Sequence, residues 1–271
     1  MDNIVFKYQK GVLFGEFPLL AEAGFINGCC SRLFGESALV PGTFNLALHV
    51  GDEASLVLAN RKKYGEALGV KAESFTTCAQ VHGSKVVRVT PELVGRGALS
   101  YENTIGATDA LITNLSQVPL LLFYADCTPV LLADKVTGAI GLAHAGWRGT
   151  VAGIAKKTVA AMVEEFGCRP ENLLGAIGPS IGACCYEVDD FVRDQAKGYE
   201  SFFVPNGKEG RYQLDLWNYN RQQLLEAGLK PEHIAVAEIC TADNKEMFCS
   251  YRAEQGKTGR MGVCLCNPGK A

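Results

Sequence analysis

Three short and almost entirely hydrophobic runs lie close together in the middle of the chain. They are PLLLFYA (residues 119–125), PVLLAD (129–134) and GAIGLAH (138–144). Runs of this length and composition are typical of strands that are covered on both faces. A short polar connection ending at Gly138 separates the last two runs, so we expect them to form a hairpin. A chain with this centre has to build sheets that are buried between other layers.

The segments around this centre alternate between strand-like and helical patterns. We expect helices over residues 52–68, 150–166 and 214–228, because each combines a helical spacing of apolar residues with a terminal glycine. Asp52 is placed to cap the first helix, and a mid-helix pair such as Asn60 and Arg61 is typical of solvated surface. Further strands are expected at 86–90, 172–178 and 259–267. Residues 6–48 are expected to form strands and turns, with a turn at Pro41-Gly42.

This order of elements indicates a fold class. Strands interleaved with helices, and joined by hairpins rather than by regular βαβ units, predict an α+β fold with mixed sheets. The sequence contains no tract of linker-like composition and no repeat of fixed period. We therefore expect residues 1–271 to form a single catalytic domain.

Charge and composition argue against several kinds of partner. The chain has a net charge of −3 and a pI of about 5.9, without a block of like charges, so nucleic acid and anionic membranes are poor partners. No segment is apolar for long enough to cross a membrane, and the N-terminus lacks the pattern of a signal peptide. We expect a cytoplasmic protein with a small-molecule substrate. Eleven cysteines, an odd number that includes two adjacent pairs, indicate reduced thiols rather than a disulfide framework.

Three side chains of metal-binding type stand next to strand-like runs. Cys127 and His144 follow two of the central runs, and His82 precedes the run at 86–90. One cysteine and two histidines are the ligand set of a catalytic zinc with an open fourth position. Cys127 has a second interpretation, as a nucleophile paired with His144 or His82 in a hydrolase. Asp126 and Asp109 are both placed to orient a ligand imidazole, and both are equally suited to a turn or a cap.

The segment AHAGWRGT (143–150) gives a candidate phosphate site. A glycine-flanked loop that opens a helix presents free backbone N–H groups, and Arg148 adds further donors. The same pattern is also expected of a tight turn with a packing tryptophan.

Several longer motifs resemble those of a known family. They are FNLALHVGDE (44–53), QVHG (80–83), DALIT (109–113), ADCTPVLLAD (125–134), HAGWRGT (144–150), AIGPSIGACCYEV (176–188) and CTADNKEMFCSYRAEQGKTGR (240–260). Together they resemble the successive signatures of the laccase-domain family, also called the multicopper polyphenol oxidase or peptidoglycan editing factor family. Its better-characterised members are zinc-dependent purine nucleoside phosphorylases. The chain departs from the family pattern at Cys249 and at Ala253, and at the latter the family often has a second arginine.

The resemblance carries expectations for fold and site. It implies a layered α/β/β/α sandwich with mixed sheets, similar to the fold of cysteine deamidase toxins. His82, Cys127 and His144 match the family's zinc ligands. Asn45 and Arg61 fall where the family contacts the nucleoside.

The resemblance also implies an activity. It is phosphorolysis of adenosine, inosine, guanosine and methylthioadenosine to the free base and ribose 1-phosphate, with adenosine deamination as a side activity. We place the phosphate at Arg148 and assign Asp126 as the acid that protonates the leaving ammonia. The partners expected are thus a purine nucleoside and phosphate, bound by a monomer or a homodimer.

Three rival functions come from the same residues. A laccase needs a blue-copper centre and a trinuclear cluster, roughly eight imidazoles, and the chain has four histidines, so copper is left only as an adventitious occupant of the His-Cys-His site. A hydrolase or amidase with Cys127 as nucleophile, acting on cell-wall precursors, is the second rival. The third is a protein that binds metal or buffers thiols without catalysis.

Overall fold

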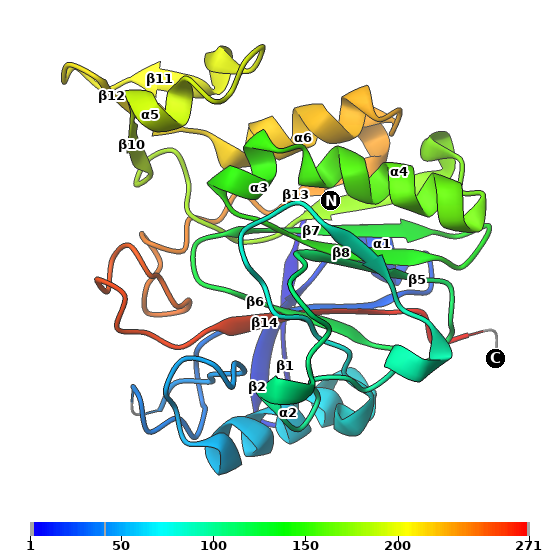
Figure 1. Ribbon diagram of the computed structural model, residues 1–271. Helices are drawn as coiled ribbons and strands as arrows, with labels where there is room; N and C mark the ends of the chain where they lie inside the picture. The colour runs from blue at the N-terminus through cyan, green and yellow to red at the C-terminus, as the bar shows by residue number, and fades with distance from the viewer. Residues whose placement is uncertain (1–2, 41, 270–271) are drawn as a thin grey trace.

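The chain folds into four layers (Figure 1). The computed structural model describes residues 3–40 and 42–269. One outer layer is α2 (Ala54–Leu68), followed by a five-stranded sheet and then a six-stranded sheet. The other outer layer contains α4 (Ile154–Phe166) and α6 (Leu216–Glu226). This order confirms the predicted α/β/β/α arrangement. The Pro41-Gly42 turn includes Pro41, which lies outside the described residues.

The five-stranded sheet is antiparallel throughout, with the order β1-β2-β3-β14-β6. The six-stranded sheet has the order β13-β9-β7-β8-β5-β4 and is mixed, because β13 pairs with β9, and β4 with β5, in parallel. The predicted hairpin is present, since β7 and β8 pair antiparallel from Thr128 opposite Ala145 to Ala133 opposite Ile140. The strands are β1 (Val5–Gln9), β2 (Val12–Glu16), β3 (Ile26–Cys30), β4 (Val86–Arg88), β5 (Ala110–Thr113), β6 (Leu120–Tyr124), β7 (Thr128–Asp134), β8 (Ile140–Ala145), β9 (Leu173–Ile177), β13 (Ile234–Val236) and β14 (Met261–Cys266).

A small lobe and several short helices complete the fold. The lobe is a three-stranded sheet with the order β10-β12-β11, which projects beyond the layers together with α5 (Figure 1). These and the remaining elements are α1 (Pro18–Ala21), α3 (Trp147–Val151), β10 (Glu187–Asp189), α5 (Asp190–Arg193), β11 (Phe203–Pro205), β12 (Arg211–Leu214) and the 3₁₀ turns η1 (Ala72–Ser74), η2 (Pro91–Leu93), η3 (Tyr101–Asn103), η4 (Pro170–Asn172), η5 (Glu200–Phe202) and η6 (Pro231–His233).

Three hydrophobic cores hold the layers together. The core between the sheets is formed by residues such as Leu122 of β6 and Leu142 of β8, both fully buried. The second core packs α4 onto the six-stranded sheet, and the third packs α2 onto the five-stranded sheet. Each buried leucine side chain contributes about 1.5–3 kcal/mol through its removal from water. Both sheets are therefore covered on both faces, as the nearly continuous hydrophobic runs predict.

The beginning of α2 differs from the expectation. The helix starts at Ala54, and Asp52 does not cap it. The Asp52 carboxylate instead accepts hydrogen bonds from the hydroxyl of Ser37, the side-chain amide of Asn45 and the backbone N–H groups of residues 38, 39 and 53. The expected end of the helix is confirmed, because Gly69 follows in the left-handed conformation at φ 72°. Asn60 and Arg61 are buried rather than solvated.

The helix expected over residues 150–166 is two helices. α3 ends at Val151 and α4 begins at Ile154, with Gly153 at φ 78° between them. The left-handed backbone of Gly153 breaks the helical hydrogen-bond pattern at no steric cost. Likewise, α1 is a short helix in a segment predicted to contain only strands and turns.

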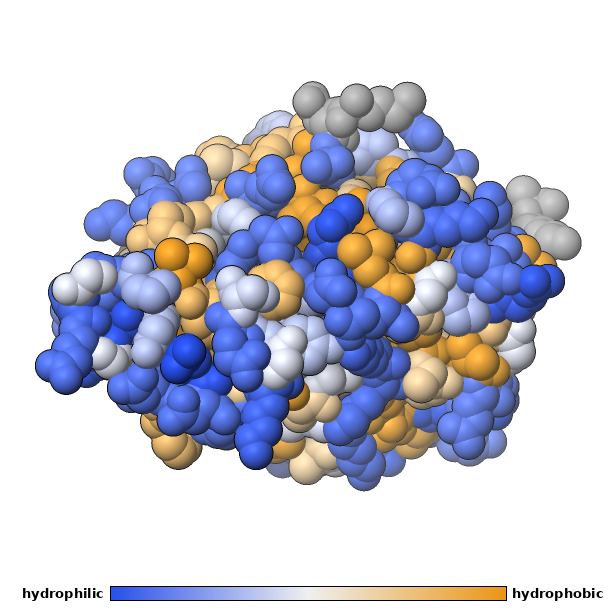
Figure 2. Space-filling model, turned by 90° about the horizontal axis from the view of Figure 1, so that it is seen from above, coloured by the Kyte–Doolittle hydropathy of each residue, from blue (hydrophilic) through white to orange (hydrophobic). Residues whose placement is uncertain are grey.

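The outer face over α4 and α6 carries mostly hydrophilic residues, with hydrophobic residues in separate groups (Figure 2). Among the described residues no helix is both long enough and apolar enough to span a membrane.

Candidate metal centre

The chain crosses from one sheet to the other at residues 125–127, which include Asp126 and Cys127. β6 of the five-stranded sheet ends at Tyr124, and β7 of the six-stranded sheet begins at Thr128. Asp126 makes the crossing with a left-handed backbone at φ 80°, a conformation to which Asp is better suited than most residues. The Tyr124 hydroxyl donates to the carbonyl of Ala143 in β8 at 3.0 Å. Cys127 is thus presented at a point where the two sheets are tied together.

The structure brings the three expected ligands together. His144 lies near the end of β8 opposite Pro129 of β7, and His82 lies on the loop before β4 with a left-handed φ of 59°. One ligand atom from each of His82, Cys127 and His144 lies within 4.8 Å of the other two. The two imidazole rings approach edge to face with centroids 4.9 Å apart. Segments far apart in the sequence therefore converge on one point.

Asp109 orients two of these ligands. Its Oδ1 lies 2.9 Å from Nδ1 of His144 and accepts the backbone N–H of His82 at 2.9 Å. Its Oδ2 accepts the N–H of Gly83 at 2.7 Å. A carboxylate on Nδ1 keeps the proton there and leaves the lone pair of Nε2 for a metal. Asp109 thus fixes both the ring of His144 and the loop that carries His82.

Asp126, the other aspartate placed to orient a ligand, has different contacts. Its carboxylate accepts the hydroxyl of Thr241 at 2.7 Å and the backbone N–H of Arg252 at 2.7 Å. Its backbone carbonyl accepts the N–H of Ile181 at 2.9 Å. Asp126 is buried, and through these bonds it holds the loops at 180–186 and 240–252 beside Cys127.

The charges of the centre favour an ionised thiol. Burial alone would raise the pKa of Cys127, but the charge of His144 and hydrogen bonds from His144 and His82 lower it to about 6. Burial alone would lower the pKa of His144, but Cys127 and Asp109 together raise it to about 9. Without a metal, the pair is thiolate and imidazolium near neutral pH. This thiolate is the form in which cysteine binds metals.

The donor set and the space around it fit a zinc ion. One thiolate and two imidazoles suit zinc, with the fourth position open to a ligand or substrate. Gly146 leaves room for this group, because a Cβ at that position would lie 3.0 Å from Sγ of Cys127 and 3.2 Å from Cδ2 of His82. Gly146 has φ −67°, so the requirement is for space and not for backbone conformation. His82, Cys127 and His144 would hold the ion.

Asn45 and Arg61, expected at the nucleoside, are buried and bonded to the chain itself. Arg61 donates to the carbonyls of Leu46, Gly97 and Ala98 at 2.6–2.8 Å. Oδ1 of Asn45 accepts the backbone N–H of Arg260 at 2.9 Å. Both residues thus fix the loops around them.

A pocket of about 510 Å³ lies between the loop that carries His49 and the loop at 256–260. His49 lies inside the FNLALHVGDE motif, and the sequence predicts no role for it in the site. Burial, and the charges of Arg260, Arg61 and His144, lower the pKa of His49 to about 4, so its imidazole is neutral near pH 7. Its ring also packs edge-on against Phe123 of β6 at 5.9 Å between centroids. The pocket is lined by Leu39, His49, Val50, Gly256, Lys257, Thr258 and Arg260.

Arg148, expected at the phosphate, lies in the first turn of α3. Its side chain is exposed, and its guanidinium lies 4.2 Å from the ring centroid of Trp147. The tryptophan is half-buried beside it. The segment is therefore both a helix start with an exposed cation and a turn with a packing tryptophan.

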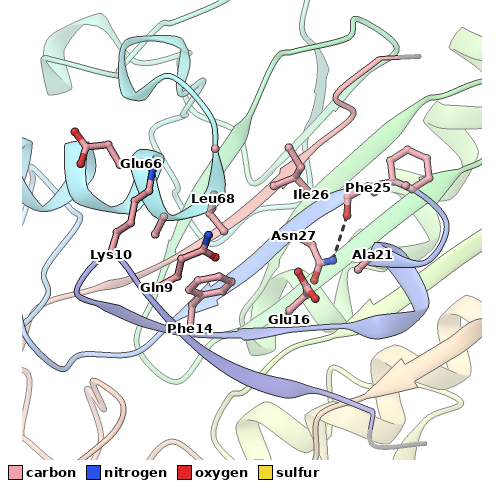
Figure 3. A pocket seen from close by; sticks show the side chains of 13 residues that line it. Gln9, Lys10, Phe14, Glu16, Ala21, Phe25, Ile26, Asn27, Glu66 and Leu68 are labelled. Carbon is pink, nitrogen blue, oxygen red and sulfur yellow. Dashed lines mark hydrogen bonds between the residues drawn. The ribbon is translucent and has the colours of Figure 1, made fainter. Parts of the chain in front are cut away.

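Another pocket lies away from this centre. It has a volume of about 390 Å³ and is lined by residues of β1–β3 and by the end of α2 (Figure 3). Its most buried polar group, the side chain of Asn27, bonds to the backbone of Phe17 and Phe25. None of the site residues predicted from the sequence lines it.

Comparison with known proteins gives relatives that align over most of the chain. The curated protein "Purine nucleoside phosphorylase YlmD" of Geobacillus stearothermophilus is 39% identical over 243 residues, which cover 88% of this chain and 89% of the relative. "Purine nucleoside phosphorylase YfiH" of Escherichia coli is 33% identical over 243 residues, covering 87% and 91%. The solved structure of YlmD from Geobacillus stearothermophilus superimposes with a TM-score of 0.90 at 36% identity, covering 98% of this chain and 99% of that chain.

A family model agrees with these likenesses. The model described as multi-copper polyphenol oxidoreductase laccase matches residues 27–267, which include every residue of the centre. The family that the sequence motifs resemble is thereby confirmed. This chain belongs to the multi-copper polyphenol oxidoreductase laccase family.

Proposed function

We propose that this protein is a zinc-dependent purine nucleoside phosphorylase that acts in the cytoplasm. Its substrates are adenosine, inosine, guanosine and methylthioadenosine, with adenosine deamination as a second activity. The observation that supports this most is the convergence of His82, Cys127 and His144, with ligand atoms within 4.8 Å of one another. Relatives that carry the name purine nucleoside phosphorylase align over most of the chain.

The centre has two tasks, which are to polarise an oxygen of a reactant and to leave a position open for substrate. When bound, zinc supplies a Lewis acid that polarises an oxygen of a reactant. Cys127 and the two histidines would hold the ion and would leave its fourth position for substrate. Asp109 orients the His144 ring and the His82 loop, so the ligands are in place before the metal arrives.

Phosphorolysis breaks the bond from C1′ to the purine and forms one from C1′ to a phosphate oxygen. The base leaves with the bonding electrons, and positive charge develops on the ribose. We assign the purine to the pocket at His49, where a neutral imidazole can exchange hydrogen bonds with the base. Lys257 and Arg260 in the same pocket, and exposed Arg148, supply positive charge for the dianionic phosphate.

Asn45 and Arg61 support this pocket from behind. Arg61 fixes the carbonyls of residues 97 and 98, shortly before η3, whose Tyr101 ring packs on His49 at 5.1 Å between centroids. Asn45 fixes the backbone of Arg260. We therefore propose both as positioning residues. Asp126, which we expect to protonate the leaving ammonia in deamination, is proposed in addition to fix the loops beside Cys127.

One experiment tests this proposal. The purified full chain is incubated with adenosine, with and without phosphate, and adenine, inosine and ribose 1-phosphate are quantified alongside metal content. We expect adenine release that depends on phosphate, and its loss together with one equivalent of metal in Cys127→Ala. Cys168→Ser is the matched control, because this buried cysteine contacts Thr137 on the α4 side, outside the centre. Metal at the centre without conversion of any nucleoside would contradict the proposal.

The lowered pKa of Cys127 also favours one rival, the cysteine hydrolase. Of the two histidines that could pair with Cys127, His144 is the one whose ring Asp109 orients, so a hydrolase with the Cys-His-Asp arrangement would use His144 and would not need His82. The Ala variant of His82 therefore separates the two functions, as described in the Discussion.

A further inference from the structure

A second group of metal-binding side chains lies on two loops near the centre. It consists of Cys184, Cys185, Cys240 and Asp243, which we call the Cys184 cluster. Their ligand atoms all lie within 4.8 Å of one another. From the sequence, the adjacent pair Cys184-Cys185 indicates only that these thiols are reduced. None of the roles described above involves the Cys184 cluster.

Two neighbouring cysteines point at one carboxylate. Sγ of Cys184 lies 3.0 Å from Oδ2 of Asp243, and Sγ of Cys185 lies 3.0 Å from Oδ1. Adjacent side chains of an extended strand point in opposite directions. Here they converge because the chain turns, with the N–H of Cys185 donating to the carbonyl of Gly182 at 3.0 Å. The turn presents both sulfurs to the same point.

The third sulfur comes from the other loop. Cys240 is held by a parallel bridge to Ser180, and its Sγ accepts the N–H of Gly182 at 3.2 Å. Backbone N–H donation to sulfur is a regular support of metal-bound thiolates. A Cβ on Gly182 would lie 3.2 Å from Sγ of Cys184 and 2.8 Å from the Trp217 ring, so the turn is closely packed around the cluster.

We propose that the Cys184 cluster is a second metal site, which binds zinc through three thiolates and one carboxylate. Thiolates select zinc over magnesium and calcium, which prefer oxygen ligands. Sulfur atoms at the corners of a tetrahedron, each ~2.3 Å from zinc, are about 3.8 Å apart. The side chains therefore need to move together by no more than about 1 Å to close the site. Each thiol gives its proton to solvent as its sulfur–zinc bond forms, and nothing is oxidised or reduced.

The site is structural in this proposal and not catalytic. All four positions around the ion come from the protein, whereas a catalytic zinc keeps one position open. The ion would join the loop at 180–186 to the loop at 240–252. These are the loops that Asp126 holds through Ile181, Thr241 and Arg252. The second site would thus stabilise the two loops that lie beside Cys127 of the first centre.

Metal content separates the two sites. We compare the full chain with Cys127→Ala, with the double variant Cys184→Ser and Cys185→Ser, and with the control Cys168→Ser, each reduced, loaded with zinc and dialysed. We expect the double variant and Cys127→Ala each to lose one equivalent of zinc, and their combination to lose both. The control is expected to keep the full amount. This outcome does not depend on phosphorolysis, so the second site and the proposed function can fail separately.

Cobalt gives a readout of the ligands themselves. Co²⁺ bound by three thiolates absorbs strongly in the near ultraviolet through sulfur-to-metal charge transfer, whereas one thiolate gives a weaker band. We expect the strong band to persist in Cys127→Ala and to be lost in the double variant. Asp243→Asn keeps all three sulfurs and removes only the carboxylate charge, so it should weaken metal binding without abolishing the band. Unchanged zinc content in the double variant, or a disulfide within the cluster of the reduced and zinc-loaded protein by mass spectrometry, would overturn the proposal.

Discussion

Oδ1 of Asp109 lies 2.9 Å from Nδ1 of His144, while the same carboxylate holds the backbone of the His82 loop. One side chain therefore controls both the tautomer of one ligand and the position of another. Although burial opposes ionisation of this carboxyl, its hydrogen bonds and the charge of His144 lower the pKa of Asp109. The centre is thus organised around a carboxylate that does not itself belong to the ligand set.

Replacing this carboxylate should weaken metal binding. Asp109→Asn removes the negative charge and turns an amide N–H toward groups that donate hydrogen bonds to Asp109. We therefore expect metal affinity at the centre to fall by about 10–100-fold. Competition with a chromophoric chelator measures this. Asp126→Asn is the comparison, because its carboxylate bonds to Thr241 and Arg252 and not to a ligand ring. Equal losses of affinity in both variants would contradict the role assigned to Asp109.

The reactivity of Cys127 should follow its lowered pKa. In protein freed of metal, the thiolate persists above about pH 6 and is protonated as the pH falls through that value. Alkylation by iodoacetamide should therefore be fast at pH 7 and slow at pH 5. Cys184 is an internal control, because loss of hydration and its bond to Asp243 raise its pKa to about 12. Mass-spectrometric mapping of the labelled cysteines over pH checks this, and a Cys127 profile centred near an ordinary thiol pKa of ~8.5 would contradict it.

His82→Ala distinguishes metal catalysis from cysteine hydrolysis. Since His82 is exposed on a loop, its removal should leave the fold intact while it removes one of three metal ligands. We expect loss of metal from the centre and loss of phosphorolysis. The nucleophile pair Cys127 and His144 survives in this variant. Phosphorolysis at wild-type rates in His82→Ala, without metal at the centre, would contradict the metal-dependent mechanism and leave Cys127 and His144 as the reacting pair.

The space at Gly146 should be as important as the ligands. In Gly146→Ala the new methyl group meets Sγ of Cys127 at 3.0 Å, so the ligands have to move apart. Overpacking of this kind costs about 1–3 kcal/mol, and at the lower end this already corresponds to about a fivefold loss of metal affinity. Gly106→Ala is the matched control, because a Cβ there meets nothing within 4 Å. Calorimetric titration measures the zinc affinity of both variants. We expect it to fall in Gly146→Ala and to stay unchanged in Gly106→Ala.

Two arginines should differ in what they support. Arg61→Met leaves several buried carbonyls without a donor and should lower the free energy of unfolding by about 3 kcal/mol. Arg148→Met removes an exposed side chain, so stability should change by less than about 0.5 kcal/mol while KM for phosphate rises. Urea denaturation and initial rates at varied phosphate measure these effects. If Arg61→Met unfolded like wild type and only raised KM, a direct contact with substrate would replace the positioning role.

The central strands could be predicted from the sequence, and so could the three residues that meet in the candidate metal centre. Nearly continuous hydrophobic runs identified β6, β7 and β8, and Gly138 and Gly69 marked a hairpin and a helix end. Cys127, His144 and His82 stood out because cysteine and histidine have a distinctive ligand chemistry next to strand ends. These signals are local, so they do not depend on how distant segments meet.

Other features depend on tertiary contacts and escaped prediction. Asp109 and Asp126 look alike in the sequence, and only the meeting of β5 with the His82 loop makes Asp109 the orienting residue. Arg61 has the helical position of a solvated residue, but the carbonyls it binds come from residues 46, 97 and 98. Cys240 and Asp243 join Cys184 only through the bridge at Ser180. The expectations of a single domain and of a monomer or homodimer stay predictions.

The crossing of residues 125–127 between the sheets has a thermodynamic consequence. Cys127 stands where the chain passes from the five-stranded to the six-stranded sheet, so a cation bound to it and to His144 of β8 would fix this crossing to the six-stranded sheet. A ligand that binds only the folded chain stabilises it by RT ln(1 + [L]/Kd), which is ~2.7 kcal/mol at a hundredfold excess over Kd. The proposed zinc would therefore add to the free energy of unfolding of the chain as well as supply its chemistry.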